Sequence, residues 1–184
     1  MVTVPFNADL DGDQMAVHVP LSAQARFEAD EVMLSSHNLL KPADGKPSTS
    51  ASQDIVLGLH YISVPKEDRK GAGRAFTSIA EAVMAYRVDE LDINAQIKIP
   101  DPTKKNSTEL IETTAGRLVF SEMLPEGFPF VNDVLDKGRL KKIIATVLRD
   151  YGREEAADFI DKLKELGFQF ATASGISWGM GDLA

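Results

Sequence analysis

The chain has 184 residues, 43% of them apolar, which is enough for one sizeable hydrophobic core or two small ones. It contains no cysteine, so disulfide bridges and thiolate zinc sites are excluded, and a reducing compartment such as the cytoplasm is favoured. The net charge of -8 argues against a free-standing nucleic-acid binder, because phosphates are neutralised by clustered Lys and Arg.

The first predicted elements follow a short acidic loop at residues 7–13. Apolar and polar residues alternate from Ala16 to Val19, which predicts a short strand. Ser22 is a good N-cap, and the apolar residues after it recur at helical spacing, so we predict an amphipathic helix from residue 22 to about 35. Residues 38–49 contain two prolines and a glycine and are predicted to be a loop.

The middle of the chain is predicted to hold two short helices and a hairpin. Ser52 is a candidate cap for one helix, and Ser78 with Glu81 three residues on is a candidate capping box for the next. Apolar residues alternate with polar ones from Ile93 to Ile99, which predicts a half-buried strand. Residues 108–113 are expected to pair back with this strand as a hairpin.

Two longer helices are predicted at residues 138–149 and 153–166, because both stretches carry a regular apolar stripe. Gly167 is expected to stop the second helix. Residues 168–184 are rich in Gly and Ser and too short for another domain. We interpret both stripes as core packing and assign them no catalytic role.

The acidic loop places Asp9, Asp11 and Asp13 at alternate positions, separated by Leu10 and Gly12. Gly12 would permit the sharp turn that directs the three carboxylates toward one point. Clustered carboxylates repel one another unless a cation neutralises them, and hard oxygen ligands select magnesium, calcium or manganese over zinc. The spacing therefore indicates either a magnesium-type site or a solvated acidic turn.

A calcium-binding EF-hand loop is the nearest competing motif, since the three aspartates match its first, third and fifth positions. That motif requires Gly at its sixth position and Glu at its twelfth. The chain has Gln14 and Pro20 there. A calcium site is therefore disfavoured.

The stretch from Asn7 to Ser22, NADLDGDQMAVHVPLS, closely resembles the signature of the largest subunit of multisubunit RNA polymerases, called beta-prime in bacteria. It departs at Leu10, where the family has Phe, so the packing of the loop is altered without loss of a ligand. The resemblance continues in further stretches, namely SQD at 52–54, TTAGR at 113–117, LP at 124–125, GF at 167–168 and SGIS at 174–177.

This resemblance implies an α+β fold in three parts. Residues 1–21 would be the end of a double-psi beta-barrel that carries the aspartate loop. Residues 22–167 would form a mainly helical pore-type domain with a small beta hairpin near 93–113, and residues 168–184 the truncated start of the following region. The implied activity is that of a DNA-directed RNA polymerase, a nucleotidyltransferase that forms phosphodiester bonds on a template from ribonucleoside triphosphates.

The resemblance also assigns roles to residues. Asp9, Asp11 and Asp13 would be the catalytic ligands of a tightly held Mg²⁺, with a second Mg²⁺ arriving with the nucleotide, and Asn7 would hydrogen-bond the ribose hydroxyls of that nucleotide. The implied partners are the beta, alpha and omega subunits, the remainder of beta-prime, and the DNA template, RNA and nucleoside triphosphates. We expect the isolated chain to be inactive, because the barrel that supports the loop is incomplete in it.

Two departures keep an alternative open. Many bacterial relatives have Arg where Ala173 stands and Asp where Gly181 stands, and that Arg would meet the triphosphate, which an alanine cannot do. The alternative is a non-catalytic truncated or split module that contacts other polymerase subunits. We expect no membrane association under either interpretation, since no apolar run approaches the roughly 18 to 20 residues that span a bilayer.

Overall fold

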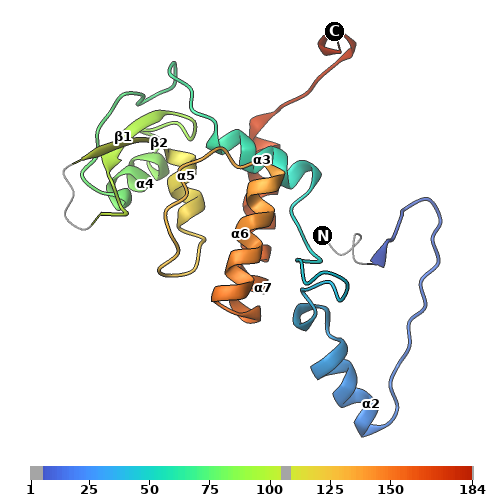
Figure 1. The fold of residues 1–184 in the computed structure, drawn as a ribbon. Coiled ribbons are helices and arrows are strands. Elements are labelled where there is room, and N and C mark those ends of the chain that lie inside the picture. The colour runs from blue at the N-terminus through green and yellow to red at the C-terminus, as the bar shows by residue number, and fades with distance from the viewer. Residues whose placement is uncertain (1–5, 105–108, 184) are drawn as a thin grey trace.

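The computed structural model describes residues 6–104 and 109–183, which form an α+β fold (Figure 1). Six α-helices and one two-stranded antiparallel sheet lie within these residues. The helices are α2 (Ala23–Phe27), α3 (Gln53–Ser63), α4 (Ile79–Arg87), α5 (Ala115–Ser121), α6 (Lys137–Asp150) and α7 (Arg153–Ser174), and the strands are β1 (Gln96–Pro100) and β2 (Leu110–Thr114). The shorter elements are the π-helix η1 (Glu28–Met33) and the 3-10 turns η2 (Ser35–His37) and η3 (Met180–Asp182).

The largest hydrophobic cluster, here called the helical core, lies where α3 crosses α6 and α7 (Figure 1). The predicted apolar stripes of α6 and α7 are confirmed as core packing, since Ile144 and Leu163 are almost completely buried. The expectation that Gly167 stops the last helix is wrong, because α7 continues to Ser174 and is capped by Gly175 in the left-handed region, at φ 57°.

Gly167 serves close packing instead of termination. A Cβ atom on Gly167 would lie 2.7 Å from Ile55 Cγ2, and one on Gly58 would lie 1.9 Å from the carbonyl oxygen of Gly167. Two helix backbones can approach this closely only where both residues lack side chains at the crossing. The contact between α3 and α7 is therefore fixed by a pair of glycines that face each other.

A second hydrophobic cluster, here called the hairpin lobe, lies between the sheet and α4. The predicted hairpin is confirmed, with β1 antiparallel to β2 and Ile99 opposite Ile111. The first strand begins at Gln96 rather than at residue 93. Ile97 and Ile99 are fully buried while Lys98 between them is exposed, which is the alternation expected of a sheet with one solvated face.

The predicted helix caps are confirmed in position and differ in detail. Ser78 Oγ accepts a hydrogen bond from the Glu81 amide at 3.2 Å, but the Glu81 carboxylate turns back to the amide and hydroxyl of Thr77 rather than to Ser78. Ser52 occupies the N-cap position of α3, and its side chain makes no capping hydrogen bond. The start of α4 is thus held by side chains, and the start of α3 depends on its packing.

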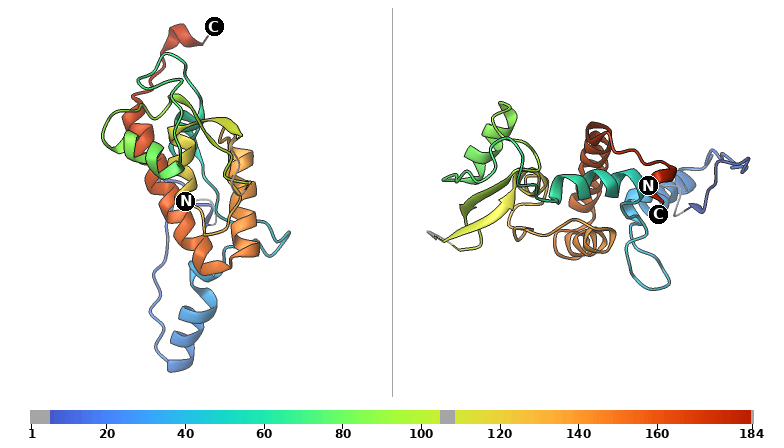
Figure 2. Two further views of the ribbon diagram at one scale, coloured as in Figure 1. Left: turned by 90° about the vertical axis from the view of Figure 1, so that its left-hand side faces the viewer. Right: turned by 90° about the horizontal axis from the view of Figure 1, so that it is seen from above.

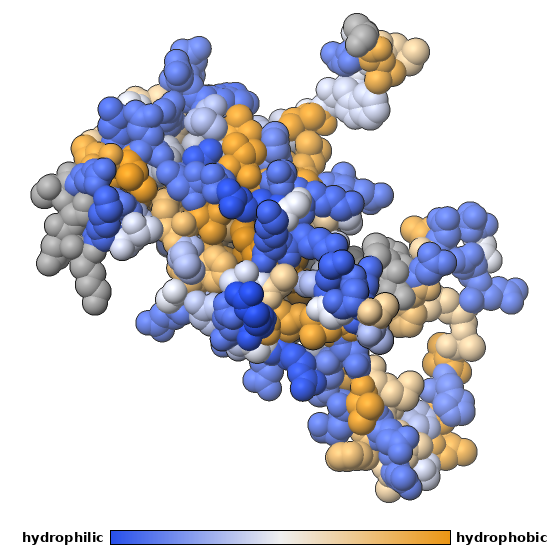
Figure 3. Space-filling view, in the orientation of Figure 1, coloured by the Kyte–Doolittle hydropathy of each residue, from blue (hydrophilic) through white to orange (hydrophobic). Residues whose placement is uncertain are grey.

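Residues 6–34 are here called the arm, and most of them project away from both clusters, while Phe6 lines a pocket together with Ile160 and Lys164 of α7 (Figures 1 and 2). The predicted helix near residues 22–35 is present as α2 followed by η1, and its apolar residues Val32 and Met33 are 61% and 73% exposed. The strand expected at residues 16–19 is not formed, because this extended segment has no neighbouring strand among the described residues. The space-filling view shows apolar surface on this projecting part (Figure 3).

Candidate metal centre

The aspartate loop at residues 7–13 is an exposed turn at the start of the arm. The Asp9 amide donates a hydrogen bond to Asp13 Oδ2 at 2.8 Å, and the Leu10 amide donates one to Asp9 Oδ1 at 2.9 Å. Gly12 lies at φ 124°, a conformation that L side chains rarely adopt, and a Cβ there would meet no atom within 4 Å. Glycine is therefore required by the backbone conformation of the turn rather than by crowding.

The three carboxylates are all exposed to solvent. Within residues 6–104 and 109–183, no three His, Asp or Glu side chains converge closely enough to hold a metal ion. One oxygen of Asp9 and one of Asp13 accept backbone hydrogen bonds within the turn. The loop thus holds the three candidate ligands in one turn without arranging them around a common point.

The donor set nevertheless fits magnesium. Ionised carboxylates are pure acceptors with two oxygens each, so Asp9 and Asp13 each keep a free oxygen beside the one used in the turn. Mg²⁺ prefers carboxylate oxygen and water ligands over nitrogen or sulfur. Asp9, Asp11 and Asp13 are therefore chemically suited to bind Mg²⁺.

Asn7 is the first residue of this turn and has φ 47°, in the left-handed region. Asn adopts this conformation more readily than most residues because its short amide can hydrogen-bond locally. Its side chain is exposed and lies in the same turn as the aspartates, so an amide donor and acceptor are available near the carboxylates. The candidate nucleotide contact and the candidate metal ligands thus share one short segment.

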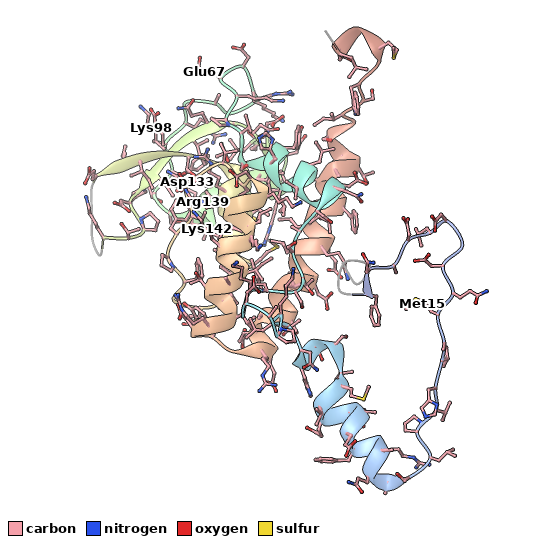
Figure 4. The ribbon with its side chains drawn as sticks, turned by 45° about the vertical axis from the view of Figure 1, so that its right-hand side comes forward. Met15, Glu67, Lys98, Asp133, Arg139 and Lys142 are labelled. Carbon is pink, nitrogen blue, oxygen red and sulfur yellow. The ribbon has the colours of Figure 1, made fainter. Side chains whose placement is uncertain are left out.

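The surroundings of the loop are open. Leu10, at the one position where the loop departs from the family signature, is 93% exposed and packs against nothing that would hold the turn. The extended segment that follows is exposed as well, and Met15 within it lies far from the labelled residues of the helical core and hairpin lobe (Figure 4). The positioning of the carboxylates is therefore not provided by the described part of the chain.

The two departures near the end of the chain lie in exposed positions. Ala173 is in the last turn of α7, and Gly181 is in η3. Neither is near the aspartate loop in the sequence, and both side-chain positions face solvent.

One polar residue of structural importance could be recognised only in the structure. Arg117, singled out only as the end of the TTAGR stretch, is half-buried and donates to carbonyl oxygens of Ser63 and Asn132 at 2.9 and 3.1 Å. Burial lowers the pKa of its guanidinium, and the nearby charge of Asp133 raises it. The available signal was an arginine inside a short apolar helix, where a charged side chain needs partners.

Among the residues that the structure describes, no helix is long and apolar enough to cross a membrane.

Two stretches of the chain match known protein families. Residues 38–183 match the family described as RNA polymerase Rpb1, domain 3, and residues 1–35 match RNA polymerase Rpb1, domain 2. The aspartate loop falls within the second of these matches, and the helical core and hairpin lobe fall within the first.

Relatives cover the whole chain. A protein of Sulfurihydrogenibium sp. (strain YO3AOP1), described as DNA-directed RNA polymerase subunit beta', is 49% identical over 183 residues, which is 100% of this chain and 11% of the relative. Proteins with the same description from Aquifex pyrophilus and Beutenbergia cavernae are 50% and 46% identical over 184 and 196 aligned positions, again 100% of this chain and 11% and 15% of the relatives. The chain therefore belongs to the Rpb1 family of RNA polymerase subunits, which includes the bacterial beta-prime subunits.

Proposed function

We propose that this chain is the part of a DNA-directed RNA polymerase that carries its catalytic aspartates, and that the polymerase forms phosphodiester bonds on a DNA template from ribonucleoside triphosphates. One observation carries the proposal. The aspartate loop lies within residues 1–35, which match an Rpb1 domain, in a chain that aligns along its full length with beta-prime relatives.

Asp9, Asp11 and Asp13 would hold Mg²⁺ through carboxylate oxygens. When bound, one such ion from the loop and a second that arrives with the nucleotide supply positive charge that makes the RNA 3'-hydroxyl more nucleophilic and offsets the negative charge that develops on the phosphate. The protein residues need no nucleophilic side chain for this reaction. Their role is to present acceptor oxygens in one turn, which Gly12 permits at φ 124°.

Asn7 would orient the incoming nucleotide by hydrogen bonds to its ribose hydroxyls. A hydroxyl both donates and accepts, and the amide of Asn offers both a donor and an acceptor group. The turn that contains Asn7 also contains the aspartates, so orienting the sugar and holding the metal would be coupled through a few residues of backbone.

The arm would be completed by other parts of the polymerase. In this proposal residues 1–21 are the end of a double-psi beta-barrel, and the remainder of beta-prime with the beta, alpha and omega subunits forms a cytoplasmic complex around DNA, RNA and nucleotides. The exposed apolar side chains of the arm support it, because such surfaces ordinarily pack against another protein surface. Val17, at 94% exposed, is an example.

Reconstitution tests the proposal. The chain is joined to the missing parts of the polymerase, and extension of an RNA primer on a DNA template is measured with and without Asp11→Ala. We expect activity with the unaltered chain, a loss of at least about 100-fold with the variant, and background incorporation from the isolated chain. Full activity of the Asp11→Ala polymerase would remove the catalytic assignment. Glu126→Ala, at an exposed position outside the loop, is the control and should retain activity.

A non-catalytic module is the second candidate, favoured by Ala173 and Gly181 at positions where many relatives carry charged residues. It would bind other polymerase subunits through the arm without supporting extension. The same reconstitution separates the two candidates, since a module would assemble with the other parts and leave incorporation at background for both Asp11 and its alanine variant.

A further inference from the structure

Residues 125–136, here called the strap, connect α5 to α6 and lie across both hydrophobic clusters. Phe128 packs on the helical core, Phe130 packs on the hairpin lobe, and Leu135 is completely buried. The strap contains no helix or strand. Its attachment to the rest of the molecule must therefore come from side chains and from individual backbone hydrogen bonds.

Arg117 provides the central attachment. Its Nε donates to the carbonyl oxygen of Ser63, at the end of α3, at 2.9 Å. Its Nη1 donates to the backbone and side-chain oxygens of Asn132, in the strap, at 3.1 and 3.0 Å. A single guanidinium thus joins α5, which carries it, to the last turn of α3 and to the strap.

Two further hydrogen bonds use the same partners. The side-chain Nδ2 of Asn132 donates to the carbonyl oxygen of Glu112 in β2 at 2.8 Å, and the backbone amide of Leu135 donates to Ser63 Oγ at 2.9 Å. Lifting the strap would break the four bonds that involve Asn132 or Leu135 together, while the bond from Arg117 to the Ser63 carbonyl oxygen, between α5 and α3, would remain.

The positions of its three acceptors determine which hydrogen bonds Arg117 would lose if the strap moved away. All of them are carbonyl or amide oxygens, and two of the three belong to the strap residue Asn132. Hydrogen bonds to a charged donor contribute more than neutral ones, and a cation near the C-terminus of a helix interacts favourably with its dipole. The half-buried guanidinium therefore keeps all three of its hydrogen-bond acceptors only while the strap is packed in place.

We propose that Arg117 is a clasp that makes the strap open and close as one unit while α3 and α7 stay packed. This conformational device is independent of the aspartate loop, which lies at the other end of the chain.

Hydrogen exchange of the full chain tests the clasp. In Arg117→Met, backbone amides of the strap, Leu135 above all, should lose protection by roughly ten-fold or more, while amides in the middle of α7 keep theirs. Arg117→Lys should lose an intermediate amount, because one ammonium cannot replace the planar fork that reaches both Ser63 and Asn132. The matched control is Arg139→Met, since Arg139 pairs with Asp133 of the strap at the exposed surface and should leave strap protection nearly unchanged.

Two outcomes would overturn the proposal. Unchanged protection in the strap of Arg117→Met would show that the clasp does not hold it, and an equal loss across strap and α7 would show that Arg117 only stabilises the whole fold. If Arg117→Met does not fold, Asn132→Ala decides by the same criterion, because it keeps the arginine and removes the strap's side-chain partner.

Discussion

The arm and the helical core use similar residues in opposite ways. Val32 and Met33 follow a helical apolar pattern and face solvent, whereas Leu59 and Leu163 follow the same kind of pattern and are completely buried. The core is determined by contacts within the chain, whereas most of the apolar side chains of the arm stay exposed. The difference separates residues that the chain buries by itself from residues that it leaves exposed, and the aspartate loop belongs to the second group.

The strongest test of this contrast is the glycine pair of the core. Gly58→Ala would place a Cβ 1.9 Å from the Gly167 carbonyl oxygen and 2.6 Å from the Ala171 amide, so the two helices must separate. We expect a loss of about 3 kcal/mol or more in the free energy of unfolding, measured by urea titration. Gly181→Ala has no atom within 4 Å of the new Cβ and should change it by less than about 0.5 kcal/mol. Equal effects would contradict the packing argument.

A pair of leucines compares the two regions directly. Leu59→Ala removes a completely buried side chain from the core and should cost about 2 to 5 kcal/mol of unfolding free energy. Leu10→Ala removes one that is 93% exposed in the arm and should cost less than about 0.5 kcal/mol. Both are measured by the same urea titration. A large cost at Leu10 would show that the arm packs against the body of the isolated chain.

The sequence predicted the core better than the arm for a physical reason. Each of the apolar patterns, in α6, in α7 and in the strand that contains Ile99, marks the buried face of its own element. The chain itself supplies the surface that packs against each face. The strand expected at 16–19 needs a neighbouring strand, which no local pattern reveals and the described residues do not provide. Gly167 was misread because a glycine that stops a helix and one that admits a second helix look alike in sequence.

The residues of the candidate site could be identified from their chemistry and from the family resemblance. Their arrangement in space could not be predicted in this way. Alternate spacing identified Asp9, Asp11 and Asp13 as possible oxygen ligands, and the turn at Gly12 is present as expected. The three carboxylates do not converge within the described part of the chain, and spacing along the sequence contains no information about their arrangement in space. Arg117 was missed because its acceptors are backbone oxygens that only the fold brings together.

A smaller difference is expected at two serine caps. Ser78 Oγ accepts from the Glu81 amide at 3.2 Å in the hairpin lobe, and Ser22 Oγ accepts from the Ala25 amide at 3.1 Å in the arm. Ser78→Ala should lower the free energy of unfolding by about 1 kcal/mol, because α4 unfolds with the lobe that it packs on. Ser22→Ala should lower only the local helicity of α2, seen as faster amide exchange there, and leave the global value nearly unchanged. Equal global losses would place α2 within the cooperative unit.

The smallest expected effect is a response to acid in the hairpin lobe. The hydrogen bonds from the Thr77 hydroxyl and amide hold the pKa of Glu81 below its ordinary value of 4.5. A carboxyl with a lowered pKa in the folded state contributes stability above its unfolded pKa and loses it as the pH falls through the folded value. The wild-type chain should therefore be more stable than Glu81→Gln at pH 7, and this advantage should shrink below about pH 4.5, as measured by thermal unfolding midpoints. An advantage that is the same at both pH values would mean that the ionised form of Glu81 is not what holds the start of α4.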